Sequence, residues 1–99
     1  MKGNEFKLKA RVWVYDDSIP WHFVTIDKDT SEEIKRFDNM PRRGFGSVPV
    51  NVRMGNTKWK TSVFPGKDGT FLLPLKKQVR EAEGIKVKSN ISFTIAVIG

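Results

Sequence analysis

Apolar and polar residues alternate along most of this 99-residue chain. The alternation is clearest over residues 5–15, 47–54 and 90–98, where every second side chain is apolar. A period of two residues is typical of a strand that buries one of its faces. Three further segments are rich in aromatic or β-branched residues and are also expected to be strands: Trp21–Ile26, Thr57–Phe64 and Thr70–Leu75.

Helical spacing replaces the alternation between residues 29 and 37. Ile34 and Phe37 lie three positions apart, as they would on the buried stripe of a helix. Thr30 and Glu33 have the spacing of a capping box, in which two side chains bind the first free N–H groups of a helix. We therefore expect a short helix over residues 29–37 with Thr30 and Glu33 as its capping box.

A second helical pattern begins at the end of the strand predicted to finish at Leu75. Leu75, Val79 and Ala82 are spaced to share one helical face. Gly84 is well placed to end this helix, because glycine readily adopts the left-handed conformation that closes many helices. The sequence thus predicts a second short helix before the last strand.

The dipeptide Gly55-Asn56 is typical of a tight hairpin turn. Pairing outward from this turn sets Val52 opposite Trp59 on the core side of the hairpin. The same register sets Arg53 opposite Lys58 on the outer side, where two like charges repel each other mildly. The hairpin is therefore expected to have one apolar and one basic face.

The expected elements follow the order strand, strand, helix, strand, once in residues 5–54 and again in residues 55–98. A chain of this length forms one domain, so both halves are expected in a single domain over residues 1–99. Closing the strands into a barrel removes the exposed edges that such apolar strands would otherwise present. The predicted fold is mainly β, a six-stranded β-barrel capped by two short helices.

The net charge of +7 is concentrated in one region. Residues 42–80 hold nine basic side chains and one acidic side chain, whereas residues 16–38 are acidic. Such asymmetry fits binding of an anionic partner, and it fits equally a solvated surface that keeps a small domain in solution. The candidate anion-binding residues of this region are Arg53, Lys58, Lys60, Arg42, Arg43 and Lys67.

The outer face of the first strand extends this hypothesis. Alternation places Lys7, Lys9 and Arg11 on the same side as Trp13 and Tyr15. Aromatic side chains beside cations stack on the bases of single-stranded nucleic acids. Nucleic acid or another polyanion is therefore the alternative partner, while the simpler interpretation is that an outward tryptophan packs beneath a helix.

The composition excludes several classes of chemistry. The chain has no cysteine, so disulfides, thiolate zinc sites and cysteine nucleophiles are excluded. No apolar run reaches the ~20 residues of a membrane helix, and the N-terminus lacks the apolar centre of a signal peptide. The carboxylate pairs Asp16-Asp17 and Asp27-x-Asp29 do not continue into a calcium-binding loop. We expect a cytoplasmic protein with no metal, no cofactor and no membrane partner.

Catalysis is not indicated by the sequence. His22 is the single histidine, and no spacing supplies the orienting partner that a general base needs. Ser62 and Asp68 lie close in sequence, but neither stands in the strand-to-helix turn of a nucleophile elbow. The protein is therefore expected not to be an enzyme.

Pro74 interrupts a predicted strand and cannot donate a backbone hydrogen bond. Its strand should therefore end or lack a partner at that point. A gap in the barrel wall beside Pro74, near Ser62 and Arg80, is the expected position of a pocket.

The segment Trp59–Ile85, W-K-T-S-V-F-P-G-K-D-G-T-F-L-L-P-L-K-K-Q-V-R-E-A-E-G-I, resembles the domain-of-unknown-function family numbered 1905. Its most specific part is the run T-S-x-x-P-x-x-D-G-x-x-x-L-P of Thr61–Pro74. The likeness covers most of the chain, although Lys88-Ser89 stands where the family has Gly-Asp before the last strand. The resemblance implies a small protein with a double-split β-barrel and assigns no activity.

A weaker likeness joins Leu75–Ile85 to the segment that precedes the last strand of AbrB-type transcription factors. Residues 26–37 repeat the same strand-to-helix step in the first half. AbrB-type proteins build their barrel from swapped hairpins of two chains, so two such units in one chain imply an internal pseudo-dimer. No DNA-contacting residue is carried across, because the matching positions are mostly core or helix-forming and fold does not imply function.

Together these observations predict a non-enzymatic binding module with an unidentified partner, acting as a monomer or a weak homodimer. Binding of nucleic acid or another polyanion through the basic region of residues 42–80 is the alternative. A hydrolase-type enzyme that uses His22 or Ser62 is the third and least supported hypothesis.

Overall fold

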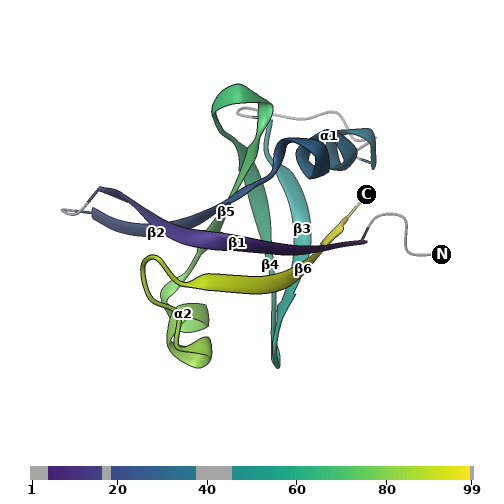
Figure 1. Ribbon diagram of the computed structural model, residues 1–99. Coiled ribbons are helices and arrows are strands. Elements are labelled where there is room, and N and C mark those ends of the chain that lie inside the picture. Colours follow the sequence, from purple (N-terminus) through teal and green to yellow (C-terminus); the bar gives the residue numbers. More distant parts are fainter. Residues whose placement is uncertain (1–4, 17–18, 38–45, 99) are drawn as a thin grey trace.

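The computed structural model describes residues 5–16, 19–37 and 46–98 (Figure 1). Within these ranges, six strands form a closed barrel in the order β1-β2-β5-β4-β3-β6, with antiparallel neighbours throughout. Two α-helices lie at opposite ends of the barrel, and no helix there is both long and apolar enough to cross a membrane. The predicted six-stranded barrel with two short helices is confirmed. The elements are β1 (Glu5–Asp16), β2 (Ile19–Ile26), α1 (Lys28–Phe37), β3 (Val48–Met54), β4 (Thr57–Pro65), the 3-10 helix η1 (Lys67–Gly69), β5 (Phe71–Leu75), α2 (Lys77–Glu83) and β6 (Asn90–Val97).

Two long strands, β1 and β4, are each shared between two parts of the barrel wall. β1 pairs with β6 as far as Arg11 and with β2 from Val12 onward. β4 pairs with β3 as far as Val63 and with β5 at Phe64 and Pro65. This sharing gives the double split that the sequence resemblance implies. Exchanging β1 with β4, β2 with β5 and β3 with β6 leaves the order of strands around the barrel unchanged.

The barrel interior contains the apolar side chains that the alternation predicts. Buried and exposed residues alternate at every position of β3. The register of β3 with β4 sets Val52 opposite Trp59 and Arg53 opposite Lys58, as predicted from the Gly55-Asn56 turn. One continuous cluster joins both halves of the chain, and a fully buried aliphatic or aromatic side chain contributes roughly 1.5–3 kcal/mol to it. Its fully buried members include Val24, Ile26, Ile34, Val48, Val50, Val63, Leu73 and Ile95.

The cap of α1 is Asp27, so the predicted capping box of Thr30 and Glu33 is wrong. The Thr30 N–H donates to Asp27 Oδ2 at 2.9 Å, which is the bond that an N-cap carboxylate makes. Glu33 instead forms an ion pair with Arg36 at 3.0 Å. Asp27 is preferred because it stands between the end of β2 and the start of α1. Its carboxylate there reaches a free N–H group of the first helical turn.

Ser31 joins α1 to the ends of two strands and is completely buried. Its hydroxyl donates to the Ile26 carbonyl at 3.1 Å and accepts from the Phe71 N–H at 3.0 Å. Ile26 and Phe71 are the last register pair between β2 and β5. The hydroxyl therefore bridges two backbone groups at the point where the strands end and the helix begins.

The apolar face of α2 differs in part from the prediction. Leu75 and Val79 are buried as expected, but Ala82 is exposed. Gly84 ends the helix in the left-handed conformation, with φ 63° and ψ 36°. The chain then turns back toward the barrel, so that Ile85 is buried in place of Ala82.

Candidate functional site

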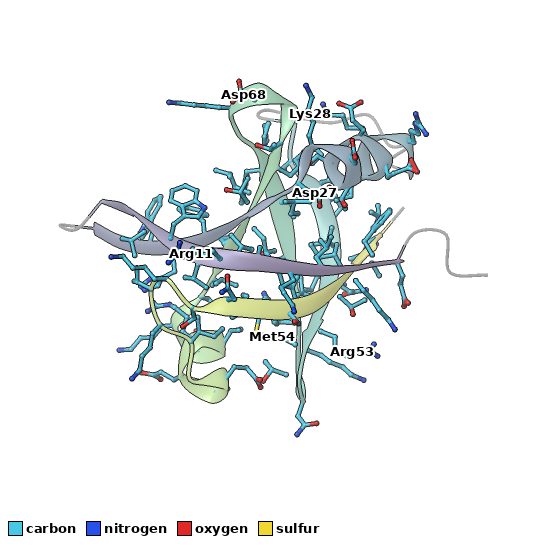
Figure 2. All side chains as sticks on the ribbon, in the orientation of Figure 1. Arg11, Asp27, Lys28, Arg53, Met54 and Asp68 are labelled. Atoms are coloured by element: carbon cyan, nitrogen blue, oxygen red, sulfur yellow. The ribbon has the colours of Figure 1, made fainter. Side chains whose placement is uncertain are left out.

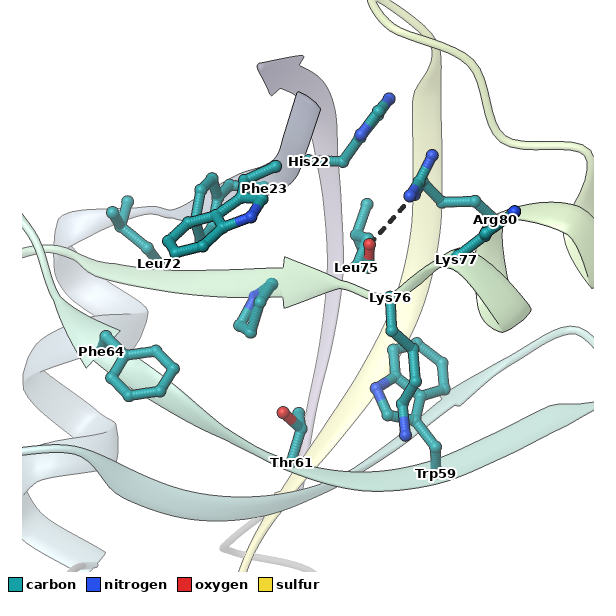
Figure 3. A pocket seen from close by; sticks show the side chains of 12 residues that line it. His22, Phe23, Trp59, Thr61, Phe64, Leu72, Leu75, Lys76, Lys77 and Arg80 are labelled. Carbon is teal, nitrogen blue, oxygen red and sulfur yellow. Dashed lines mark hydrogen bonds between the residues drawn. The ribbon is translucent and has the colours of Figure 1, made fainter. Parts of the chain in front are cut away.

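The barrel wall opens where β4 and β5 separate. These strands form two register pairs, Phe64 with Leu72 and Pro65 with Phe71. β5 nevertheless goes on pairing with β2 as far as Leu75. Pro74, which has no N–H for a ladder bond, lies on the stretch of β5 that has left β4. A cavity of about 710 Å³ occupies this gap (Figure 3).

Most of the cavity wall is apolar. β2 contributes Trp21 and Phe23, β5 contributes Leu72 and Pro74, and Phe64 stands on β4 across the gap. The Trp21 side chain is 64% exposed and the Phe64 side chain is 39% exposed. Large apolar side chains open to solvent around a concave surface are typical of a binding site.

The inner part of the cavity is formed by β4. Trp59 and Thr61 lie opposite Val52 and Val50 of β3, and so belong to the inner face of the strand. The indole N–H of Trp59 is buried and has no hydrogen-bond partner among the described residues. In Figure 3 the nitrogen-bearing edge of this indole is turned to the side where Thr61 stands. Because an unsatisfied buried donor costs about 1–3 kcal/mol, a ligand that offers an acceptor here gains a favourable contact.

Three cations stand at one end of the cavity. Lys76 follows β5 directly, and Lys77 and Arg80 belong to α2. Arg80 Nε donates to the Leu75 carbonyl at 3.1 Å, which fixes the guanidinium at the end of β5. Its outer nitrogens carry the planar pair of donors that suits a carboxylate or a phosphate. The cavity thus has an apolar body and a cationic end.

The position of α2 depends on the turn between β3 and β4. Thr57 Oγ1 donates to Glu83 Oε2 at 2.5 Å, joining the last residue of α2 to the first residue of β4. Gly55 has φ +57°, and a Cβ built on it would lie 2.6 Å from Glu83 Oε1. The turn therefore favours glycine for its conformation, and a side chain at position 55 would have to displace the flexible end of Glu83.

His22 lies in the cavity wall. The described lining residues include no aspartate and no glutamate. Among the described residues, no three His, Asp or Glu side chains gather into a group that would hold a metal ion. That the protein is not an enzyme stays a prediction.

Two of the three predicted pocket residues line the cavity. Pro74 and Arg80 are in its wall, whereas Ser62 is not and pairs with Pro49 of β3. Thr61 takes the place that was expected for Ser62, because neighbouring residues of a strand point to opposite faces. Counting the alternation back from buried Val63 would have identified Thr61. Binding of a ligand by these residues stays a prediction.

The predicted anion-binding set is divided by the fold. Arg53, Lys58 and Lys60 lie together on the outer face of β3 and β4. Lys67 belongs to η1, which packs with α1 at the other end of the barrel. Arg42 and Arg43 fall outside the described residues. Binding of an anion by this set also stays a prediction.

Residues 8–95 match the family described as "Domain of unknown function (DUF1905)". The chain belongs to this family. The segment Thr61–Pro74, on which the sequence resemblance was strongest, supplies four of the lining residues of this DUF1905 member: Thr61, Phe64, Leu72 and Pro74. No curated protein matches the chain.

Proposed function

We propose that this domain binds a small molecule with an apolar or aromatic body and an anionic group, and does not transform it. The proposal rests on one observation, a cavity that combines aromatic walls with three cations at one end. Its volume of about 710 Å³ lies within the range of about 300–1,000 Å³ that is common for small-molecule sites. Rings of the ligand would pack against Trp21, Phe23 and Phe64, with the anionic group toward α2.

Two features favour an anionic ligand over a purely apolar one. Arg80 is already fixed through its bond to the Leu75 carbonyl, so little side-chain entropy is lost when it binds an anion. The Trp59 N–H adds a donor at the inner end of the cavity. Ligand binding without catalysis and a cytoplasmic location both remain parts of the proposal.

The test uses 1-anilinonaphthalene-8-sulfonate, whose rings and sulfonate have the required chemistry, and N-phenyl-1-naphthylamine, which lacks the sulfonate. We expect saturable fluorescence enhancement with both probes. Changing both Lys76→Gln and Lys77→Gln should weaken binding of the sulfonate about 3–10-fold, because charge-assisted contacts are lost, and leave the neutral probe unchanged. Thr61→Phe should weaken binding of both probes, because the larger ring occupies the inner part of the cavity.

Lys67→Gln is the control, because it removes one exposed cation that does not line the cavity. It should leave both affinities unchanged. The proposal fails if Thr61→Phe, shown to be folded by its thermal transition, binds both probes as tightly as the unchanged protein. It also fails if Lys67→Gln weakens the sulfonate as much as the double change does.

A further inference from the structure

Exposed cations line two sides of the outer face of the β1-β6-β3-β4 sheet. Lys7 and Lys9 project from β1, and Arg53, Lys58 and Lys60 project from β3 and β4; all five are exposed. Between them β6 presents the small side chains of Ser92, Thr94 and Ala96. We call this surface the basic trough, with the five cations as its walls and these three residues of β6 as its floor. In Figure 2 the Arg53 side chain extends away from the barrel into solvent.

The strand registers set the width of the basic trough. Lys7 pairs with Thr94, Thr94 with Arg53 and Arg53 with Lys58, so one row crosses four strands. Neighbouring strands lie about 4.8 Å apart, which puts the cations of β1 and β3 roughly 10 Å apart across β6. Hollows of about 390 and 450 Å³ lie on the two sides of Arg53, and both include Thr94.

The charges of the basic trough are unbalanced within the described residues. Arg53 stands directly opposite Lys58, an arrangement that costs stability through like-charge repulsion. The acidic residue of this face, Glu5, lies at its edge opposite Ala96. The ion pairs seen between described residues, Lys35 with Glu32 and Arg36 with Glu33, lie on α1, away from this face. An extended anion laid along the floor would neutralise both walls together.

We propose that the basic trough binds the sugar–phosphate backbone of a single-stranded nucleic acid, a function separate from ligand binding in the cavity. The β1 row continues from Lys7 and Lys9 to Arg11 and then to Trp13. A cationic track that leads to an aromatic side chain is an arrangement on which a base can stack. Many duplex readers place a helix or a two-stranded ribbon in the major groove, whereas an open sheet face flanked by cations suits the backbone of a single strand.

The experiment measures fluorescence anisotropy of a labelled 20-nucleotide oligo-dT with the full chain. If all five wall cations contact phosphates, log K should fall with log salt at a slope of about −3.5, roughly 100-fold between 50 and 200 mM salt. The double change Lys7→Glu and Arg53→Glu places one reversed charge on each wall. It should weaken binding about 10–100-fold, and the new carboxylate at position 53 would face Lys58, so the fold is preserved.

The control double change Lys28→Glu and Lys67→Glu alters the net charge by the same amount at the α1 end of the barrel. It should change the affinity less than about threefold. If the two double changes weaken oligo-dT binding equally, the attraction is due to net charge alone and the proposal is overturned. It is also overturned if oligo-dT does not bind at 50 mM salt. Trp13→Leu should weaken oligo-dT about fivefold, the lower range for loss of one stacked base, and leave heparin binding unchanged.

Heparin or duplex DNA bound as tightly as oligo-dT at the same salt would overturn the assignment to a single strand. Excess 1-anilinonaphthalene-8-sulfonate should not displace oligo-dT, since the cavity opens beside β4 and β5 and the trough lies over β6. A failure of ligand binding in the cavity can therefore be distinguished from a failure of oligo-dT binding in the basic trough.

Discussion

The helices at the two ends of the barrel occupy equivalent places in the chain. The two ends differ in how tightly they are closed. α1 follows β2, and α2 follows β5, so each helix comes after the second strand of its unit. At the α1 end, Ser31 and Ile34 of the helix are both completely buried. At the α2 end, Val79 is the buried residue of the helix, and the cavity lies beside it.

The difference lies in where each helix makes its polar contacts. α1 uses the Ser31 hydroxyl to bind backbone groups of β2 and β5 in the interior. α2 is attached at its far end, through Glu83 at the β3–β4 turn, and presents Lys77 and Arg80 to the gap between β4 and β5. The same strand-strand-helix-strand unit thus produces a closed end at α1 and an open end at α2.

Ser31→Ala is expected to have the largest effect on stability. The change leaves the Ile26 carbonyl and the Phe71 N–H without their shared partner, and each buried unsatisfied group costs about 1–3 kcal/mol. We expect a loss of about 2–4 kcal/mol, measured as the free energy of unfolding in urea. The lower value applies if β2 and β5 move together and the two groups bond directly.

Ser92→Ala is the control for this measurement, because Ser92 is an exposed serine on the floor of the basic trough. It should change the unfolding free energy by less than about 0.5 kcal/mol. If the two serine changes cost the same, the α1 end is not closed by the buried hydroxyl and the comparison between the ends is wrong.

Gly55→Ala tests how α2 is attached and should have the next largest effect. Alanine at φ +57° is strained, and its Cβ would displace the Glu83 carboxylate from Thr57. We expect a loss of about 2–3 kcal/mol, of which roughly 1 kcal/mol is backbone strain and the rest a lost charged hydrogen bond.

Gly84→Ala separates these two contributions. Gly84 has φ +63°, and a Cβ there would meet nothing within 4 Å. Gly84→Ala should therefore lower the free energy of unfolding by the backbone strain alone, about 1 kcal/mol. Equal losses of unfolding free energy at positions 55 and 84 would mean that the Glu83 contact contributes nothing to the attachment of α2.

Features that depend on near neighbours in the chain were predicted well. The alternation of β3 and its register with β4 follow from a two-residue period and from the two-residue turn at Gly55-Asn56. The burial of Ser31 was not predictable, because it depends on the Phe71 N–H, 40 positions away. The capping box was wrong because Asp27 and Thr30 both fit local capping rules, and the end of β2 decides between them.

The site was predicted only in part for the same reason. Pro74 marked the place where the wall opens, since its missing N–H is a local property. Trp21 and Phe23 reach the cavity because β2 pairs with β5, which no local pattern encodes. Lys67 and Lys58 are close in sequence but lie at different ends of the barrel, so charge counted along the chain grouped residues that the fold separates.

Asp27 gives the smallest expected effect and tests the α1 end through its pH dependence. Burial alone would raise the pKa of Asp27, but hydrogen bonds from the Thr30 N–H and hydroxyl and from its own N–H outweigh burial and hold the pKa below 3.8. The folded state therefore binds this proton less readily than the unfolded state does. The stabilisation is complete above the unfolded pKa and is lost as the pH falls through the lower folded pKa.

Asp27→Asn keeps a good cap and removes the charge, so it should cost only about 0.3–1 kcal/mol at pH 7, toward the lower value because the carboxylate is exposed. This cost should begin to shrink as the pH falls below 3.8 and should vanish only below the lower folded pKa, where the carboxylate of the unchanged protein is neutral as well. Asp27→Ala loses the cap itself and should cost about 1 kcal/mol at pH 7, with a remaining deficit in acid. Urea unfolding of the three proteins from pH 7 to pH 3 checks this, since contributions that the three proteins share cancel in the differences between them. A deficit of Asp27→Asn that stays constant over this range would show that the carboxylate charge is not what stabilises the start of α1.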